Sequence, residues 1–145
     1  MSSIDWENIN SKITDHFTVE DALWLHKWNR LANEFDGLTD ELCADLIDTF
    51  HMAEDVRDLL DSPMKITSGF RPPTYSILVG GNDHDPHTRA LAIDFIPLIL
   101  STDQAKGLLL PQLDSLEIRM ENNGRGSSYI HVDRSPVVHN RFFLP

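Results

Sequence analysis

Apolar side chains between Thr39 and Pro63 recur at three- and four-residue steps, which is the period of one face of an α-helix. The members of this stripe are Leu42, Leu46, Ile47, Phe50, Ala53, Val56, Leu59 and Leu60. Thr39 is a suitable N-cap, and Pro63 cannot continue a helix. The pattern therefore predicts a long amphipathic helix between these two residues.

A shorter apolar series precedes this helix. Thr18 is a candidate N-cap with Asp21 three residues further on, as at many helix starts. The apolar series behind it consists of Ala22, Leu23, Leu25 and Trp28. We expect a first helix that ends near Phe35, where Asp-Gly at 36–37 supplies a stop.

After Pro63 the spacing changes to that of strands. The segments 64–70 (MKITSGF) and 91–99 (LAIDFIPLI) have the apolar density of strands, and 115–135 contains two more strands joined by a glycine-rich turn. A long Pro- and Gly-rich loop is expected at 71–87, where such loops often carry function. Thr102 is expected to cap a third helix over 103–113, interrupted or ended at Pro111, and the apolar tail 137–145 is expected to pack back on the domain.

This order of elements predicts an α+β fold, with a small antiparallel sheet packed against about three helices. The 145 residues have 41% hydrophobic and 24% charged side chains, close to globular averages, so we expect one domain over residues 1–145. Cys43 excludes an intrachain disulfide because it is the single cysteine. Its helical setting favours a buried apolar role over that of a nucleophile.

The net charge is −11, from 12 basic and 23 acidic residues. A surface of this sign repels phosphate backbones and anionic lipids, so neither nucleic acid nor a membrane is expected as a partner. The first residues lack the basic and apolar regions of a secretory signal, and the longest apolar stretch, 95–100, is too short to span a bilayer. We therefore expect a protein that is cytoplasmic as synthesised.

Two histidines and one aspartate stand out by their setting. Asp94 lies in the strand LAIDF, seven residues after His87, and His131 lies in the strand YIHVD. An imidazole or carboxylate that faces an apolar core from a strand is costly unless it is paired or bound to a metal. Zinc accepts both ligand types, and three protein ligands plus one water is its usual catalytic arrangement. Surface or satisfied core roles remain the alternative on residue types alone.

The stretch 66–95, ITSGFRPPTYSILVGGNDHDPHTRALAIDF, resembles the core signature of the zinc D-alanyl-D-alanine carboxypeptidase family, whose members share the Hedgehog/DD-peptidase fold. The family's Ser-Gly-aromatic-Arg stands here at Ser68, Gly69, Phe70 and Arg71, and its Val-Gly-Gly at Val79, Gly80 and Gly81. Its histidine-to-aspartate run is matched by His87, Ala92 and Asp94, and its distant His-Val strand by His131. The resemblance covers a core at 17–134, between an N-terminal extension at 1–16 and a tail at 135–145.

The resemblance implies that His87, Asp94 and His131 ligate one zinc ion, Zn²⁺. It also implies that Arg71 anchors a substrate carboxylate or stabilises the tetrahedral oxyanion, tasks that suit the paired donors of a guanidinium. The alternative for Arg71 is an exposed loop side chain. The glycines at 80–81 either let the backbone turn tightly beside the site or belong to an ordinary loop.

The sequence departs from the family pattern at three places. Asp85 replaces a serine that touches substrate, which makes Asp85 a candidate substrate-binding residue. Its charge would partly oppose an anionic peptide terminus, or it could orient His87 or Arg71. Ala90 replaces a glycine. The third departure concerns the general base, because the family's Glu or His shortly before the last ligand is replaced by Ser128 and Tyr129, neither of which is a competent base near neutral pH.

Other carboxylates are available as the base. Glu121 is the first candidate, because the turn at 122–128 would bring it across from Tyr129 or His131, and Asp133 is the second. The alternative for each is a surface ion pair with an arginine, of which the nearest in sequence are Arg119, Arg125 and Arg134. Tyr129 is a further candidate as an oxyanion or substrate donor, and His84 is close enough in sequence to reach the cleft.

Two functions from different classes follow from these residues. The first is a zinc metallopeptidase that hydrolyses peptidoglycan stem peptides at a D-amino acid, as a D-Ala-D-Ala carboxypeptidase or endopeptidase. It would suit a phage-encoded enzyme that reaches the cell wall by another route, or a part of a phage particle. The second is a non-catalytic member that keeps zinc as a structural or binding element, which the missing base and Asp85 favour.

Overall fold

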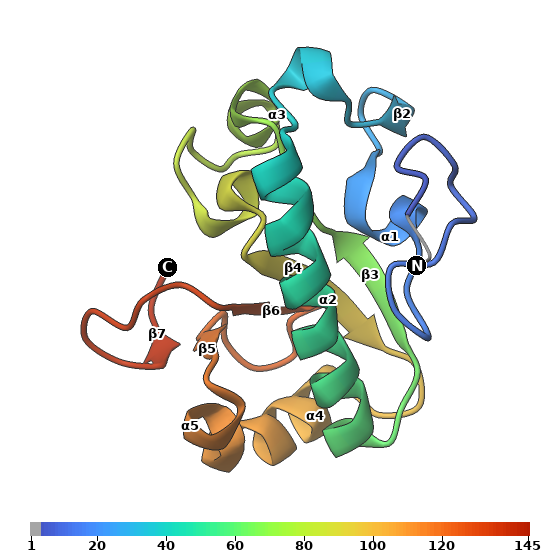
Figure 1. Ribbon diagram of the computed structural model, residues 1–145. Helices are drawn as coiled ribbons and strands as arrows, with labels where there is room; N and C mark the ends of the chain where they lie inside the picture. Colours follow the sequence, from blue (N-terminus) through green and yellow to red (C-terminus); the bar gives the residue numbers. More distant parts are fainter. Residues whose placement is uncertain (1–3) are drawn as a thin grey trace.

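The longest helix, α2 (Asp40–Leu60), crosses one face of a five-stranded sheet in the computed structural model, which describes residues 4–145 (Figure 1). The sheet has the strand order β3-β4-β6-β5-β7, and a separate hairpin pairs β1 with β2. The other helices are α1 (Val19–Leu23), α3 (Pro73–Leu78), α4 (Thr102–Leu109) and α5 (Leu113–Leu116), with 3-10 turns η1 (Glu34–Asp36), η2 (Pro86–Arg89) and η3 (Leu110–Gln112). The strands are β1 (Trp24–Leu25), β2 (Arg30–Leu31), β3 (Met64–Ser68), β4 (Ala92–Pro97), β5 (Arg119–Glu121), β6 (Ile130–Asp133) and β7 (Phe142–Phe143).

The α+β class expected from the sequence is confirmed. The pairs β3–β4, β4–β6 and β5–β6 are all antiparallel. The apolar tail does pack back, because β7 adds to the sheet beside β5. That last pair is parallel, so the sheet is mixed rather than purely antiparallel as expected.

Alternation along the central strands separates the core from the opposite face of the sheet. Ile93 and Phe95 of β4 and Ile130 and Val132 of β6 are fully buried members of the hydrophobic core, to which the inner face of α2 also belongs. Successive side chains of a strand point to opposite faces. The intervening residues of these strands, Asp94 among them, therefore lie on the face that α2 does not cover.

The second predicted helix is confirmed, and its start follows from the capping residue. The Thr39 side chain accepts a hydrogen bond from the Leu42 amide at 3.2 Å, and the helix ends at Leu60 with Asp61 in the left-handed region. Leu46, Phe50, Ala53, Val56 and Leu60 of the predicted stripe are buried. Leu59 is 37% exposed, at the margin of the stripe.

The expected first helix was predicted too long. It begins after Thr18 as expected but ends at Leu23, and the chain then forms the β1–β2 hairpin. The carbonyl of Ala22 accepts from the Phe70 amide at 2.8 Å, and that of Leu23 from the Ala32 amide, also at 2.8 Å. These carbonyls are thus committed to other segments and do not continue a helical ladder, which sequence spacing alone does not reveal.

Two local predictions in the second half are also corrected. The segment 71–87 is not a structureless loop, because it contains α3 and the start of η2. The cap of α4 is Ser101 rather than Thr102: its hydroxyl accepts from the Gln104 amide, and the Gln104 side chain accepts from the Ser101 amide. This reciprocal pair starts the helix one residue earlier than expected.

Cys43 is half-buried rather than a core residue. Burial, with a smaller effect of Asp40, raises the pKa of its thiol to about 11, so the thiol stays protonated and unreactive near neutral pH. Among residues 4–145, no helix combines the length and the apolar character that crossing a membrane requires.

Candidate metal centre

Two neighbouring strands and one turn bring three metal-ligand side chains together. Asp94 of β4 is paired with His131 of β6, and His87 comes from η2, just before β4. The three residues are buried, with exposed fractions of 3% for His87, 7% for Asp94 and 6% for His131. One ligand atom from each residue lies within 4.8 Å of the others. The structure thus assembles the three residues that the sequence selected.

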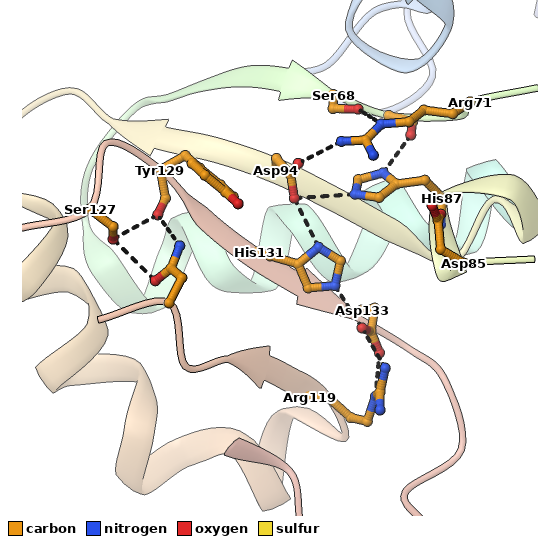
Figure 2. Close-up of polar contacts among 12 residues, drawn as sticks. Ser68, Arg71, Asp85, His87, Asp94, Arg119, Ser127, Tyr129, His131 and Asp133 are labelled. Carbon is orange, nitrogen blue, oxygen red and sulfur yellow. Dashed lines mark hydrogen bonds and ion pairs between the residues drawn. The ribbon is translucent and has the colours of Figure 1, made fainter. Parts of the chain in front are cut away.

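One oxygen of Asp94 stands between the two imidazole rings (Figure 2). Its Oδ1 is 3.2 Å from His87 Nε2 and 2.9 Å from His131 Nδ1. The two rings meet edge to face, with centroids 5.2 Å apart. Nε2 of one ring and Nδ1 of the other therefore point at the same carboxylate.

The outer nitrogen of each ring is held by an acceptor. His87 Nδ1 lies 2.8 Å from the Gly69 carbonyl oxygen, and His131 Nε2 lies 2.7 Å from Asp133 Oδ2. A carbonyl or carboxylate oxygen only accepts, so each outer nitrogen carries a proton, and a metal ion would take the lone pair of each inner nitrogen in place of a proton. Three electron-pair donors then face one point. Two histidines and one aspartate arranged in this way fit a divalent cation such as zinc.

Gly69 reaches this position because α1 packs directly against it. A Cβ atom at Gly69 would lie 2.5 Å from the Ala22 carbonyl oxygen, so no larger residue fits without moving the backbone. The neighbouring Phe70 amide donates to that same oxygen. The glycine therefore lets α1 approach β3 and leaves its own carbonyl directed at His87.

The electrostatics of the cluster favour positive charge at its centre. Burial alone would raise the pKa of Asp94, but the charges and hydrogen bonds of His87 and His131 hold it well below its usual value. Burial alone would lower the pKa of His131, but hydrogen bonds to Asp133 and Asp94 raise it to about 9. The site therefore attracts a cation, whether a proton on the imidazole or a metal ion.

Asp133 holds His131 in place. It is fully buried and forms a paired ion bridge with Arg119, at 2.7 Å from Nε and 2.9 Å from Nη2. Burial would raise the pKa of Asp133, but His131 and Arg119 bring it down to about 2. Both carboxylate oxygens are committed to these partners. The structure thus places Asp133 behind the imidazole as its acceptor, rather than free in the cleft as the second candidate base.

Arg71 lies on the other side of Asp94. Its Nε donates to the Ser68 hydroxyl at 2.8 Å, its Nη2 donates to Asp94 Oδ2 at 3.0 Å, and its backbone amide donates to the His87 carbonyl. The side chain is mostly buried, with 17% exposed. The expected alternative, an exposed loop arginine, does not describe this residue.

A cleft of about 300 Å³ opens over the three ligand residues. Arg71, Glu121 and Tyr129 are among the residues that line it. β5 pairs with β6 so that Arg119 faces Asp133, and the same register continued by two residues sets Glu121 opposite His131. Glu121 thus lies beside the cluster, as expected for the first candidate base.

Two of the three arginines that were the expected alternative partners of Glu121 are engaged elsewhere. Arg119 is bound to Asp133, and Arg134 donates to the Thr49 hydroxyl and to the Asp45 carbonyl. Neither therefore neutralises Glu121. Glu121 thus lines the cleft without either of these two partners, and the charge of Lys106 acts on it.

Tyr129 extends its ring toward Asp94 in Figure 2. Partial burial raises the pKa of its phenol, and the charges of Glu121 and Asp94 act in the same direction. The phenol therefore stays protonated and can donate a hydrogen bond inside the cleft. Tyr129 thus stays a candidate for the donor role that the sequence suggested.

Asp85 acts through the backbone of the first ligand residue. Its Oδ1 accepts from the His87 amide at 2.8 Å and its Oδ2 accepts from the Ser76 hydroxyl, so the side chain caps η2. It lines the cleft but contacts neither the His87 ring nor the Arg71 side chain, the two partners considered for it. Gly81 allows this packing, because a Cβ there would lie 2.6 Å from Asp85 Oδ2.

His84 does not take part in the cluster. It is exposed, and its Nδ1 lies 2.9 Å from Asp83 Oδ1. Sequence analysis missed Phe143, whose ring packs edge-on against His131 at 5.8 Å between centroids. Arg119, which the sequence offered as an ion-pair partner of Asp133, lies 4.1 Å from the centroid of the Phe143 ring. The apolar tail was the only sequence signal for this arrangement.

A family model described as Peptidase M15 matches residues 16–133, most of the chain. No curated protein and no solved structure matches this chain. The ligand residues, Arg71 and Glu121 all fall inside the matched range. The resemblance to the zinc D-Ala-D-Ala carboxypeptidases drawn from the sequence motifs is thereby confirmed, and the chain belongs to the Peptidase M15 family of metallopeptidases.

Proposed function

We propose that the protein is a zinc metallopeptidase that hydrolyses peptidoglycan stem peptides at a D-amino acid, as a D-Ala-D-Ala carboxypeptidase or endopeptidase. One observation carries the proposal. His87 Nε2, Asp94 Oδ1 and His131 Nδ1 converge beneath a cleft that also contains a guanidinium, a carboxylate and a phenol. These are the groups that metal-assisted hydrolysis of a peptide requires.

Each group has a task in this proposal. Zinc held by the three ligand residues would polarise the scissile carbonyl and lower the pKa of water. Glu121 accepts a proton from the attacking water and returns it to the leaving amine. Tyr129 donates a hydrogen bond to the oxygen on which negative charge develops.

Arg71 recognises the substrate in the same scheme. Its guanidinium lies against Asp94 through Nη2, and none of the protein hydrogen bonds described for residues 4–145 uses its Nη1. A free donor beside the ligand cluster suits the carboxylate at the end of a stem peptide. The negative net charge of the chain makes this local positive group more important for binding an anionic peptide.

A second candidate function is a zinc-binding member without catalysis. It is favoured by one observation, namely that Ser128 and Tyr129 stand where well-known members carry their base. The two functions differ in a single requirement: the enzyme needs Glu121 to transfer protons, and the binding protein does not.

Release of D-alanine from a synthetic stem peptide and from purified peptidoglycan, measured by mass spectrometry on zinc-loaded protein, tests the proposal. We expect turnover by the wild type, loss of activity in His131→Ala, and a loss of about 100-fold or more in Glu121→Gln. Glu117→Gln, which changes an exposed carboxylate on the same segment, is the matched control and should keep full activity. Zinc binding without turnover by the wild type would favour the non-catalytic function.

A further inference from the structure

The turn between β5 and β6 carries Tyr129 into the cleft. The Asn122 amide still donates to the Phe143 carbonyl of β7, but no strand pairing holds residues 123–129. Helix α4 supplies the missing contacts. The Thr102 hydroxyl donates to the Ser127 carbonyl at 2.7 Å, and the Gly126 amide donates to the Asp103 carboxylate at 3.0 Å. The turn is therefore fixed from outside the sheet.

Lys106 provides the central contact between α4 and the turn. Its ammonium donates to the Asn123 side-chain oxygen, to the Gly124 carbonyl at 2.9 Å and to the Ser127 hydroxyl. An ammonium has three protons, so these three partners use its whole donor capacity. Lys106 lies one helical turn from Thr102 and Asp103, and the three residues thus act from one face of α4.

The contacts continue from Lys106 to Tyr129, and Figure 2 shows the last of them, between Ser127 and Tyr129. The side-chain amide of Asn123 donates through Nδ2 to the Tyr129 carbonyl at 3.0 Å, and the Ser127 hydroxyl lies 3.2 Å from the same oxygen. Both residues that hold the Tyr129 backbone are themselves bonded to Lys106. The backbone of Tyr129 is fixed by this network one step before β6 begins, so the direction of its phenol depends on the network too.

We propose that Lys106 is a positioning residue of the active site: through Asn123 and Ser127 it fixes the turn that presents the Tyr129 phenol to the substrate carbonyl. The inference rests on the proposed peptidase function. Lys106 itself does not contact the substrate in this scheme. Its hydrogen bonds act on the reaction through Tyr129, whereas its charge also acts on Glu121. The dependence on Tyr129 separates the positioning role of Lys106 from that of a residue that only stabilises the fold.

A double-mutant cycle tests the inference. Tyr129→Phe should lower kcat by about 100-fold, as removal of an oxyanion donor does, and Lys106→Met should lower kcat about 10-fold or more with little change in KM. In the Tyr129→Phe background, Lys106→Met should cost less than about two-fold. Lys106→Arg, which keeps charge and donors, should recover part of the lost rate, and Lys12→Met, an exposed lysine, should have no effect.

Hydrogen exchange measured on zinc-loaded protein without substrate gives a readout independent of activity. Lys106→Met should speed exchange of the amides in 122–129, Gly126 among them, while exchange in α2 stays unchanged. Unchanged exchange in the turn, or losses of kcat that add fully in the double variant, would overturn the inference. Absence of turnover in the wild type would overturn the proposed function, and with it the catalytic role of Tyr129. Turnover with additive losses would overturn only the role of Lys106.

Discussion

Replacing Asp133 by asparagine preserves the shape of the side chain but changes what it offers to His131. In the structure Asp133 accepts from His131 Nε2, from two nitrogens of Arg119 and from the Ser135 amide. An asparagine keeps one acceptor oxygen and presents an NH₂ group, itself a donor, in place of the other. Either the imidazole or the guanidinium then loses its acceptor.

The size of the effect follows from these contacts. Loss of the acceptor behind a metal-bound histidine typically weakens metal affinity about 10- to 100-fold. We therefore expect the zinc affinity of Asp133→Asn to fall by this factor, roughly 1.4–2.7 kcal/mol of binding free energy. The variant also leaves Arg119 without its full partner in a mostly buried site, so its thermal stability should fall as well.

Competition for zinc with a coloured chelator measures the affinity, and circular dichroism checks that the variant is folded. Asp114→Asn is the matched control. Asp114 also pairs with an arginine, Arg141 at 2.6 Å, but its side chain is 95% exposed and lies outside the cleft. Its removal should leave zinc affinity unchanged. Equal affinities of wild type and folded Asp133→Asn would refute the role assigned to the buried carboxylate.

Two further predictions follow from the pKa values. In chelator-treated protein, the pKa of His131 rises from 6.5 to about 9 on folding. The stabilisation from His131 is therefore complete below pH 6.5 and is lost as the pH rises through about 9. The pKa of Asp133 falls from 3.8 to about 2, so Asp133 stabilises the fold above pH 3.8 and loses this contribution as the pH falls through about 2. The Tm with chelator should therefore fall between pH 6.5 and 9.5, and a Tm that stays level would contradict the prediction. Cys43, with a pKa of about 11, should react with iodoacetamide at pH 8 roughly 100-fold more slowly than free cysteine, and alkylation at the free rate would contradict the burial of its thiol.

The parts of the fold that were predictable are those set by local patterns. The α2 stripe is long and has a clear N-cap, so its spacing admits one reading. The apolar residues after Thr18 fit a helix and a hairpin equally well, and the choice is made by Phe70 and Ala32, which bond the carbonyls of α1 from distant parts of the chain. The apolar tail was the only sequence feature that indicated packing of the C-terminus on the domain, and nothing in it indicated that β7 would pair with β5 in parallel.

The candidate site shows the same division. The candidate ligand residues were selected because strand position and the family motif both pointed to them, and the structure brings them together although His87 and His131 are far apart in sequence. An ion pair of Asp133 with Arg119 was among the alternatives from the sequence, but the place of Asp133 behind His131 was not predictable, because it depends on one particular register of β5 and β6. The register is set by the packing of whole strands. The contact of Lys106 with the β5–β6 turn likewise depends on tertiary packing and has no local signal in the sequence.

The most direct test of the account is a crystal structure of the zinc-loaded protein with anomalous data collected at the zinc edge. The account predicts one strong anomalous peak per chain, within bonding distance of His87 Nε2, an Asp94 carboxylate oxygen and His131 Nδ1. A zinc ion bound elsewhere, with these three side chains still joined only to each other, would contradict it.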